Sequence, residues 1–143
     1  MTISELLESQ AHRLGDRTML VFNDQNISYR ECNTAAGRVA GNLKARGVAD
    51  GDKVVLLSGN CPEFLYCFLG LGRIGAVIVP VNPTLAIEEL LYIINDSDAE
   101  TVVLAAELAP YLPKLRGLLP KVRQYFVIGG NAESGAEPFD VLL

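Results

Sequence analysis

The chain has 143 residues, half of them apolar and a fifth charged, which fits one globular domain and excludes a disordered or fibrous protein. Its formal net charge of −5 opposes the negative phosphates of nucleic acids, so binding of DNA or RNA is not expected. Cys32, Cys61 and Cys67 have neither zinc spacing nor the even number that disulfide pairs need. Reduced thiols and a cytoplasmic location are therefore expected.

The first residues predict an amphipathic helix rather than a signal peptide, because Glu5 and Glu8 interrupt the apolar run that a signal peptide needs. The expected apolar face consists of Ile3, Leu6, Leu7 and Leu14. His12, the sole histidine, then falls on the polar side. Because no catalytic partner for it can be identified, we expect a solvated surface residue.

A short hairpin and a well-marked helix are expected next. Segments 18–22 and 26–28 flank the polar turn NDQ, which predicts a β-hairpin. Ser28 and Glu31 have the spacing of a capping box, which marks a helix start. The residues that then recur at helical spacing are Tyr29, Cys32, Ala36, Val39 and Leu43. Gly47 predicts the end of this helix.

From residue 53 onward, short apolar runs alternate with helical patterns. The expected strands are 53–58, 76–81, 101–105 and 125–129, and the expected helices are 62–74, 87–95 and a proline-interrupted segment at 108–118. This alternation predicts the α/β class, with a mostly parallel β-sheet flanked by helices on both faces and a short hairpin before it.

Three features could suggest a membrane, metal or redox function, but each has a simpler explanation. Residues 64–81 are apolar but contain Arg73 and Pro80, so a buried helix and a buried strand are expected instead of a transmembrane segment. The carboxylates of Glu88, Glu89, Asp96 and Asp98 suit the solvated face and end of a helix better than a metal site. Cys61 and Cys67 lie about 240° apart around a helix, which argues against a redox pair.

The motif GLGRIGA has the glycine spacing of a dinucleotide-binding fingerprint, with glycines at 70, 72 and 75. In that fingerprint the glycines precede a helix, whose amino terminus faces the pyrophosphate. Here a predicted helix with Asn60 as its N-cap comes first and a strand follows. We therefore interpret the glycines as close packing of this helix against the sheet. Gly75 would end the helix, and Arg73 would complement its dipole.

The chain closes with a loop rich in Gly, Ser and Glu, followed by Pro138 in a favourable first helical position. The sequence stops five residues later, so the last predicted element looks interrupted. We expect residues 1–143 to be one subdomain cut from a longer protein.

Several motifs, taken in order, resemble the opening of the adenylate-forming superfamily, in particular the acyl-CoA synthetases. ISYREC is similar to the family's Tyr-x-Glu-Leu element at 29–32, with Cys32 in place of leucine. Residues 73–83 match a basic residue, Gly-Ala and an apolar strand that closes in Pro-x-Asn-Pro. The resemblance covers residues 16–128. Ala86 departs from the Thr or Ser that commonly caps the next helix, and we expect Thr84 to take over that cap.

The resemblance implies an enzyme that joins a carboxylic or fatty acid to ATP, with Mg²⁺, and then passes the acyl group from the acyl-adenylate to coenzyme A. It places the phosphate loop and the catalytic lysine in later segments, and no Thr-Gly-x-Pro-Lys-Gly stretch occurs in this chain. We therefore assign no catalytic, cofactor-binding or metal-ligating residue, and expect the 143 residues alone to be inactive and to bind no cofactor.

The alternative is a free-standing, non-catalytic α/β module that binds a partner through an unpaired sheet edge. A domain separated from its neighbours would also expose apolar surface, so a homodimer or a strand-exchanged dimer is expected.

Overall fold

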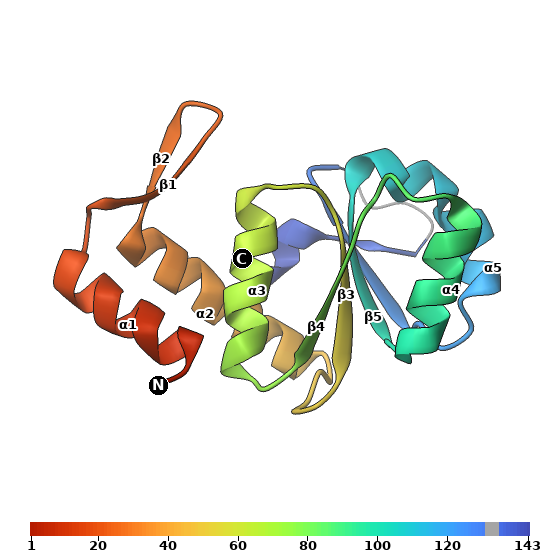
Figure 1. Ribbon diagram of the computed structural model, residues 1–143, viewed down its shortest axis with the longest axis horizontal. Helices are drawn as coiled ribbons and strands as arrows, with labels where there is room; N and C mark the ends of the chain where they lie inside the picture. Colours follow the sequence, from red (N-terminus) through yellow and green to blue (C-terminus); the bar gives the residue numbers. More distant parts are fainter. Residues whose placement is uncertain (131–134) are drawn as a thin grey trace.

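The computed structural model describes residues 1–130 and 135–143 and shows a sheet between two helical layers, with a smaller unit at the amino end (Figure 1). The elements in chain order are α1 (Ile3–Leu14), β1 (Thr18–Phe22), β2 (Gln25–Ser28), α2 (Tyr29–Ala45), β3 (Lys53–Leu57), α3 (Pro62–Arg73), β4 (Val77–Val81), α4 (Ile87–Ser97), β5 (Thr101–Ala105), the 3₁₀ helix η1 (Ala106–Tyr111), α5 (Leu112–Leu118), β6 (Gln124–Ile128), β7 (Glu137–Pro138) and the 3₁₀ helix η2 (Phe139–Leu142). The main sheet has the order β4-β3-β5-β6-β7, and all its pairs are parallel. The predicted α/β class, parallel sheet and amino-terminal hairpin are confirmed.

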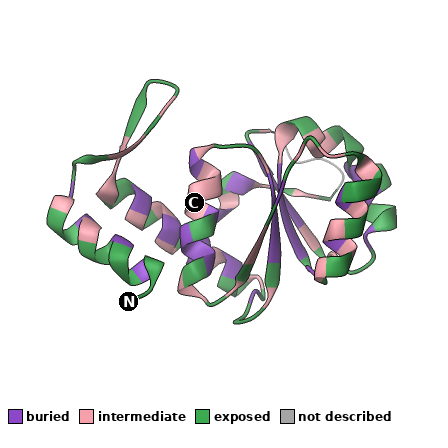
Figure 2. Cartoon of the chain, viewed as in Figure 1, coloured by how far each residue is buried: buried purple, intermediate pink, exposed green. Residues whose placement is uncertain are grey.

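The central strands are buried on both faces (Figure 2). Val54 and Leu56 pack in one core with residues of α2, α3 and η2. Val55 and Leu57, which alternate with them, pack in a second core with residues of α4 and α5. Because both faces are covered, these strands have no polar alternation in their sequence. Helices therefore lie on both faces, as predicted.

The two fingerprint glycines inside α3 pack against other helices. A Cβ at Gly70 would lie 2.8 Å from the backbone oxygen of Ala36 on α2, and one at Gly72 would lie 3.3 Å from Oγ of Ser4 on α1. The expectation that they pack a helix against the sheet is therefore wrong, since the sheet lies on another side of α3. Gly75 has φ +72° directly after the helix end, which confirms its predicted role.

The amino-terminal unit consists of α1 and the β1–β2 hairpin, which packs against α2 and points away from the sheet (Figure 1). Asn23 and Asp24 form the turn, both with positive φ, which suits a tight hairpin. Only part of the expected apolar face of α1 is covered, because Ile3 is 56% and Leu6 45% exposed. His12 is exposed, as predicted.

Two predicted helix caps are wrong. Cys61 rather than Asn60 is the N-cap of α3, and its side chain makes no capping hydrogen bond. Ala86 remains the N-cap of α4, where its backbone N–H donates to Oε2 of Glu89 at 3.1 Å. Thr84 therefore does not take over this cap, because an acid three residues into the helix already holds its first turn.

Both edges of the sheet differ from the expectations. Val81 alone is buried in β4, which lies at an edge, so the expected buried strand is wrong. At the other edge, the short strand β7 had no counterpart in the prediction, and Pro138 precedes η2 instead of opening an α-helix. Segment 108–118 divides into η1 and α5. The predicted loop before Pro138 includes 131–134, which lie outside the described residues.

The Gly70 contact predicts a measurable cost for a single methyl group. Gly70→Ala should lower the free energy of unfolding by about 1–3 kcal/mol, because the methyl group meets rigid backbone of α2. The matched control is Gly41→Ala in α2, where nothing lies within 4 Å of the new Cβ. That change should raise stability by about 0.5–1 kcal/mol. Guanidinium denaturation measures both, and equal stability of Gly70→Ala and the parent chain would contradict the packing described.

Candidate functional site

The carboxyl ends of the neighbouring strands β3 and β5 lie side by side at the top of the sheet in Figure 1. These strands are neighbours, yet β3 leads into α3 on one face and β5 leads into η1, which packs with the core on the opposite face. In open parallel sheets, ligands bind where consecutive connections diverge in this way. Residues 58–61 follow β3 at this switch point, and η1 follows β5 there.

The loop that follows β3 is held by its own contacts. Oγ of Ser58 donates to the backbone oxygen of Gly59 at 3.0 Å and lies 3.6 Å from Sγ of Cys61. Asn60 is exposed beside them. The loop therefore offers neutral polar groups at the carboxyl end of β3.

The loop that follows β4 is fixed by Asn82. Its Oδ1 accepts hydrogen bonds from the backbone N–H of Thr84 at 2.9 Å and from Thr84 Oγ1 at 2.7 Å. This side-chain turn holds the chain as it leaves the strand for α4. The resemblance motif Pro-x-Asn-Pro thus ends in a rigid connection at the same edge of the sheet.

The chemistry available at this edge is limited. In the main sheet, the residues that follow β3, β4 and β6, at 58–61, 82–86 and 129–130, include no Lys, Arg or His, and β5 continues directly into η1 with two alanines at 105–106. The first backbone N–H groups of α3 have no side-chain cap, so they favour oxygen atoms of a ligand over cations. These parts can orient polar groups but supply no cation to neutralise a triphosphate. That no catalytic or cofactor-binding residue lies in this chain stays a prediction.

A cavity of about 390 Å³ opens at the same edge, between β6 and β7. Its lining includes Gly129, Gly130, Phe139 and Asp140. Among the described residues that line it, Asp140 alone is ionisable, and its exposed carboxylate would repel a phosphate. The cavity widens the carboxyl edge without adding a group that binds ATP.

The fingerprint glycines lie at the opposite edge. Gly75 precedes β4, and its backbone oxygen accepts a hydrogen bond from the N–H of Gly51 at 2.9 Å. The order helix, glycine, strand is confirmed, so the carbonyl end of the α3 dipole faces this turn. The geometry gives a dinucleotide no helix amino terminus here.

Arg73 has a role that the sequence did not indicate. Its guanidinium donates to Oδ1 of Asn33 on α2 and lies 3.9 Å from Oε1 of Glu8 on α1. Gly37 leaves the necessary room, since a Cβ there would lie 2.9 Å from Nη1. Arg73 therefore links three helices, besides complementing the dipole of α3. The sequence signal that was available is a glycine at position 37, which faces the basic Arg73. Which residues Arg73 pairs with depends on how the helices cross.

The three thiols are free. Burial raises the pKa of Cys67, and burial followed by the charge of Glu31 raises the pKa of Cys32. Cys61 is partly exposed at the start of α3, whereas Cys32 and Cys67 are buried.

The predicted acidic positions are all exposed: Glu88, Glu89, Asp96 and Asp98. Among residues 1–130 and 135–143, no three His, Cys, Asp or Glu side chains lie together as a metal ion would require. In the same residues, no helix has the length and apolar character needed to cross a membrane.

The fold is an α/β unit with a topological switch point between β3 and β5, and comparison with known proteins identifies its family. The sequence pattern described as AMP-binding enzyme matches residues 7–140. The chain is 36% identical over 126 residues to the 3-hydroxybenzoate/4-hydroxybenzoate CoA ligase of Thauera aromatica, covering 88% of this chain and 24% of that one. It superposes on an anthranilate CoA ligase in complex with anthranoyl-AMP at a TM-score of 0.93 and 28% identity, covering 99% of this chain and 27% of that one.

A fatty acyl CoA synthetase of Mycobacterium tuberculosis is also similar, with a TM-score of 0.81, 32% identity, and coverage of 88% of this chain and 26% of that one. The chain belongs to the AMP-binding enzyme family. It spans about a quarter of the length of the hydroxybenzoate ligase that it matches. The resemblance predicted from its motifs is confirmed.

The burial of the thiols predicts selective alkylation. Under native conditions at neutral pH, iodoacetamide should modify Cys61 and leave Cys32 and Cys67 intact, because the latter two are buried and have raised pKa values. Peptide mass spectrometry identifies the modified residues, and alkylation in denaturant, which should label all three, is the control. Rapid native labelling of Cys67 would show that α3 is not packed as described.

Proposed function

We propose that residues 1–143 form the amino-terminal part of a longer ATP-dependent acyl-CoA ligase and are inactive without the remainder. The observation that carries the proposal is the family match over nearly the whole chain, combined with coverage of about a quarter of a ligase relative. The carboxyl edge supports it, because its loops position polar groups but contain no cation for ATP.

The proposed reaction has two steps. A carboxylate oxygen attacks the α-phosphorus of ATP, the bond to the β-phosphate bridge breaks, and pyrophosphate leaves. The sulfur of coenzyme A then attacks the acyl carbon, AMP leaves, and the thiol proton is released. The complex of an anthranilate CoA ligase with anthranoyl-AMP, an acyl-adenylate, supports an adenylate as the intermediate.

In this proposal the 143 residues frame the site. The loop after β3 leaves a strand buried on both faces, the loop after β4 leaves the edge strand paired with it, and Ser58 and Asn82 stabilise these loops locally. ATP, Mg²⁺ and coenzyme A would be bound mainly by later segments, which would supply the phosphate loop and the catalytic lysine.

The substrate is proposed at the level of a carboxylic acid. The relatives carry names that refer to hydroxybenzoates, anthranilate and fatty acyl groups. A fatty acid remains one member of that range, and the cytoplasmic location stays a prediction.

A second candidate, a free-standing module that associates through a sheet edge, is favoured by the geometry of β4. This strand pairs on one side with β3, carries no charged side chain and leaves Val77 46% exposed. Edge strands without charged side chains can pair with other chains, and Pro80 removes one N–H donor from this edge. Sedimentation at increasing concentration would detect the predicted dimer.

The activity prediction compares two polypeptides. The 143-residue chain and the longest natural polypeptide that carries it are each incubated with ATP, Mg²⁺, coenzyme A and a panel of benzoates and fatty acids. We expect acyl-CoA and AMP from the longer polypeptide only, because the shorter one lacks the cations that hold ATP. Mass spectrometry quantifies both products.

Reactions without acid or without coenzyme A serve as controls. Acyl-CoA formation by the 143-residue chain alone would contradict the assignment of catalysis to later segments. A longer polypeptide that is folded but inactive with every acid would contradict the ligase function itself.

A further inference from the structure

The outer face of α4 has a feature that the proposed reaction does not use. Tyr92 is 70% exposed there, beside an apolar hollow of about 460 Å³. The hollow is lined by Leu85, Glu88, Glu89, Tyr92 and Ile93. Leu85 and Ile93 pack against the core from outside, so the hollow has an aliphatic floor.

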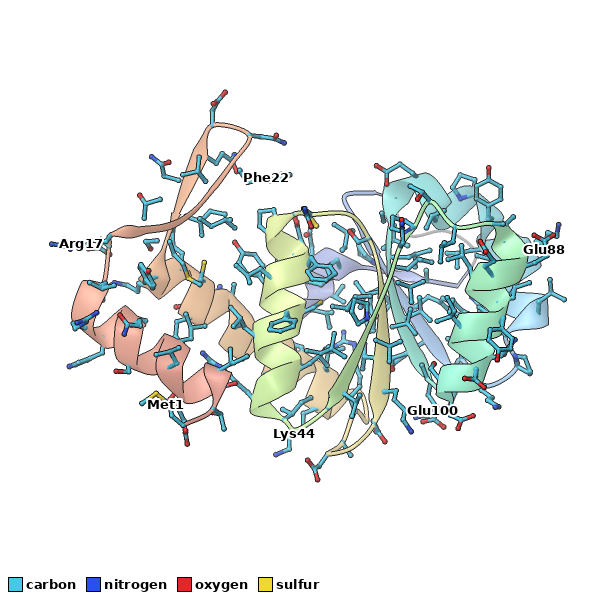
Figure 3. The ribbon with its side chains drawn as sticks, in the orientation of Figure 1. Met1, Arg17, Phe22, Lys44, Glu88 and Glu100 are labelled. Atoms are coloured by element: carbon cyan, nitrogen blue, oxygen red, sulfur yellow. The ribbon has the colours of Figure 1, made fainter. Side chains whose placement is uncertain are left out.

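The charged residues that α4 contributes around this hollow are all acidic. α4 contains Glu88, Glu89 and Asp96 but no Lys or Arg. In the described part of the chain, neither Glu88 nor Asp96 takes part in an ion pair, whereas the nearby Asp98 is bridged by Lys121 at 2.5 Å. Figure 3 shows Glu88 on the side of α4 that points away from the sheet.

We propose that this face of α4 docks a positively charged polypeptide segment that carries an aliphatic side chain. The aliphatic side chain would fill the hollow above Leu85 and Ile93, a Lys or Arg would pair with Glu88, and an Arg could lie over the ring of Tyr92. The surface is defined by residues 85–93.

Charge complementarity selects this occupant over the others. The uncompensated carboxylates repel anionic lipid headgroups and nucleic acid phosphates. A second copy would have to bring its own basic surface, since two α4 faces set against each other would oppose like charges. The proposal does not depend on the ligase activity, because α4 packs on the face opposite α3.

The probe is a short synthetic amphipathic peptide of Leu and Arg, with a twin in which Glu replaces every Arg. Titration of the 143-residue chain, followed by ¹H–¹⁵N NMR spectroscopy, should shift the amide signals of 85–93 with the basic peptide only. Tyr92→Ala and Glu88→Arg should each weaken binding about tenfold, as for residues at the centre of an interface.

The matched control is Asp50→Arg, which changes the net charge as Glu88→Arg does but lies in an exposed loop beside Gly75. It should leave the affinity within about twofold. If Glu88→Arg and Asp50→Arg lowered the affinity for the basic peptide equally, overall charge alone would explain the effect, and the proposal would be overturned. The proposal would also be overturned if the acidic twin or phosphatidylserine vesicles bound and shifted the same amide signals of 85–93. Circular dichroism verifies that each variant is folded.

Discussion

Burial of the central strands on both faces is the constraint on which the rest of the structure depends. Val54 to Leu57 are almost fully inaccessible, and the neighbouring strands β5 and β6 are buried similarly. Such strands are stable only when helices cover both faces, so the connections after β3 and β5 must turn to opposite sides. The switch point at the carboxyl edge, between β3 and β5, follows directly from that divergence. The close approach of α2 and α3 at Gly70 then allows the amino-terminal unit to attach to one of these layers.

The buried strands form a framework, but the loops at their carboxyl ends offer little chemistry. Each connection at the carboxyl edge is short and stabilised by neutral contacts, as at Ser58 and Asn82, and none carries a cation. An enzyme that handles ATP must neutralise several negative charges in a site shielded from water. The loops at the carboxyl edge contain no Lys, Arg or His for that purpose, and the chain matches about a quarter of a ligase relative. In the proposed enzyme, this chain fixes the positions of the loops at the carboxyl edge, and the later segments supply the positive charge that ATP requires.

Sequence patterns correctly predicted the features that depend on local periodicity. They failed for features that depend on how elements far apart in the sequence pack together. The strands, the Ser28–Glu31 capping box and the role of Gly75 were predicted correctly, since each follows from backbone preferences within a few residues. The edge position of β4 depends on strand order, and the two-residue β7 is too short to leave a pattern. The link from Arg73 to α1 and α2 depends on how three helices cross. The switch point between β3 and β5 was missed for the same reason, because it arises from topology and not from a motif.

The most direct measurement is the mass of the native polypeptide that carries this sequence, determined in its source cells with an antibody against residues 1–143. A polypeptide several times heavier than the 15.4 kDa chain is the result that the account predicts, because the AMP-binding fold would then continue into the segments that bind ATP. A stable native product of 15.4 kDa would contradict it. The protein would then be a non-catalytic member of the family, and its open edge and the face of α4 would become its principal functional surfaces.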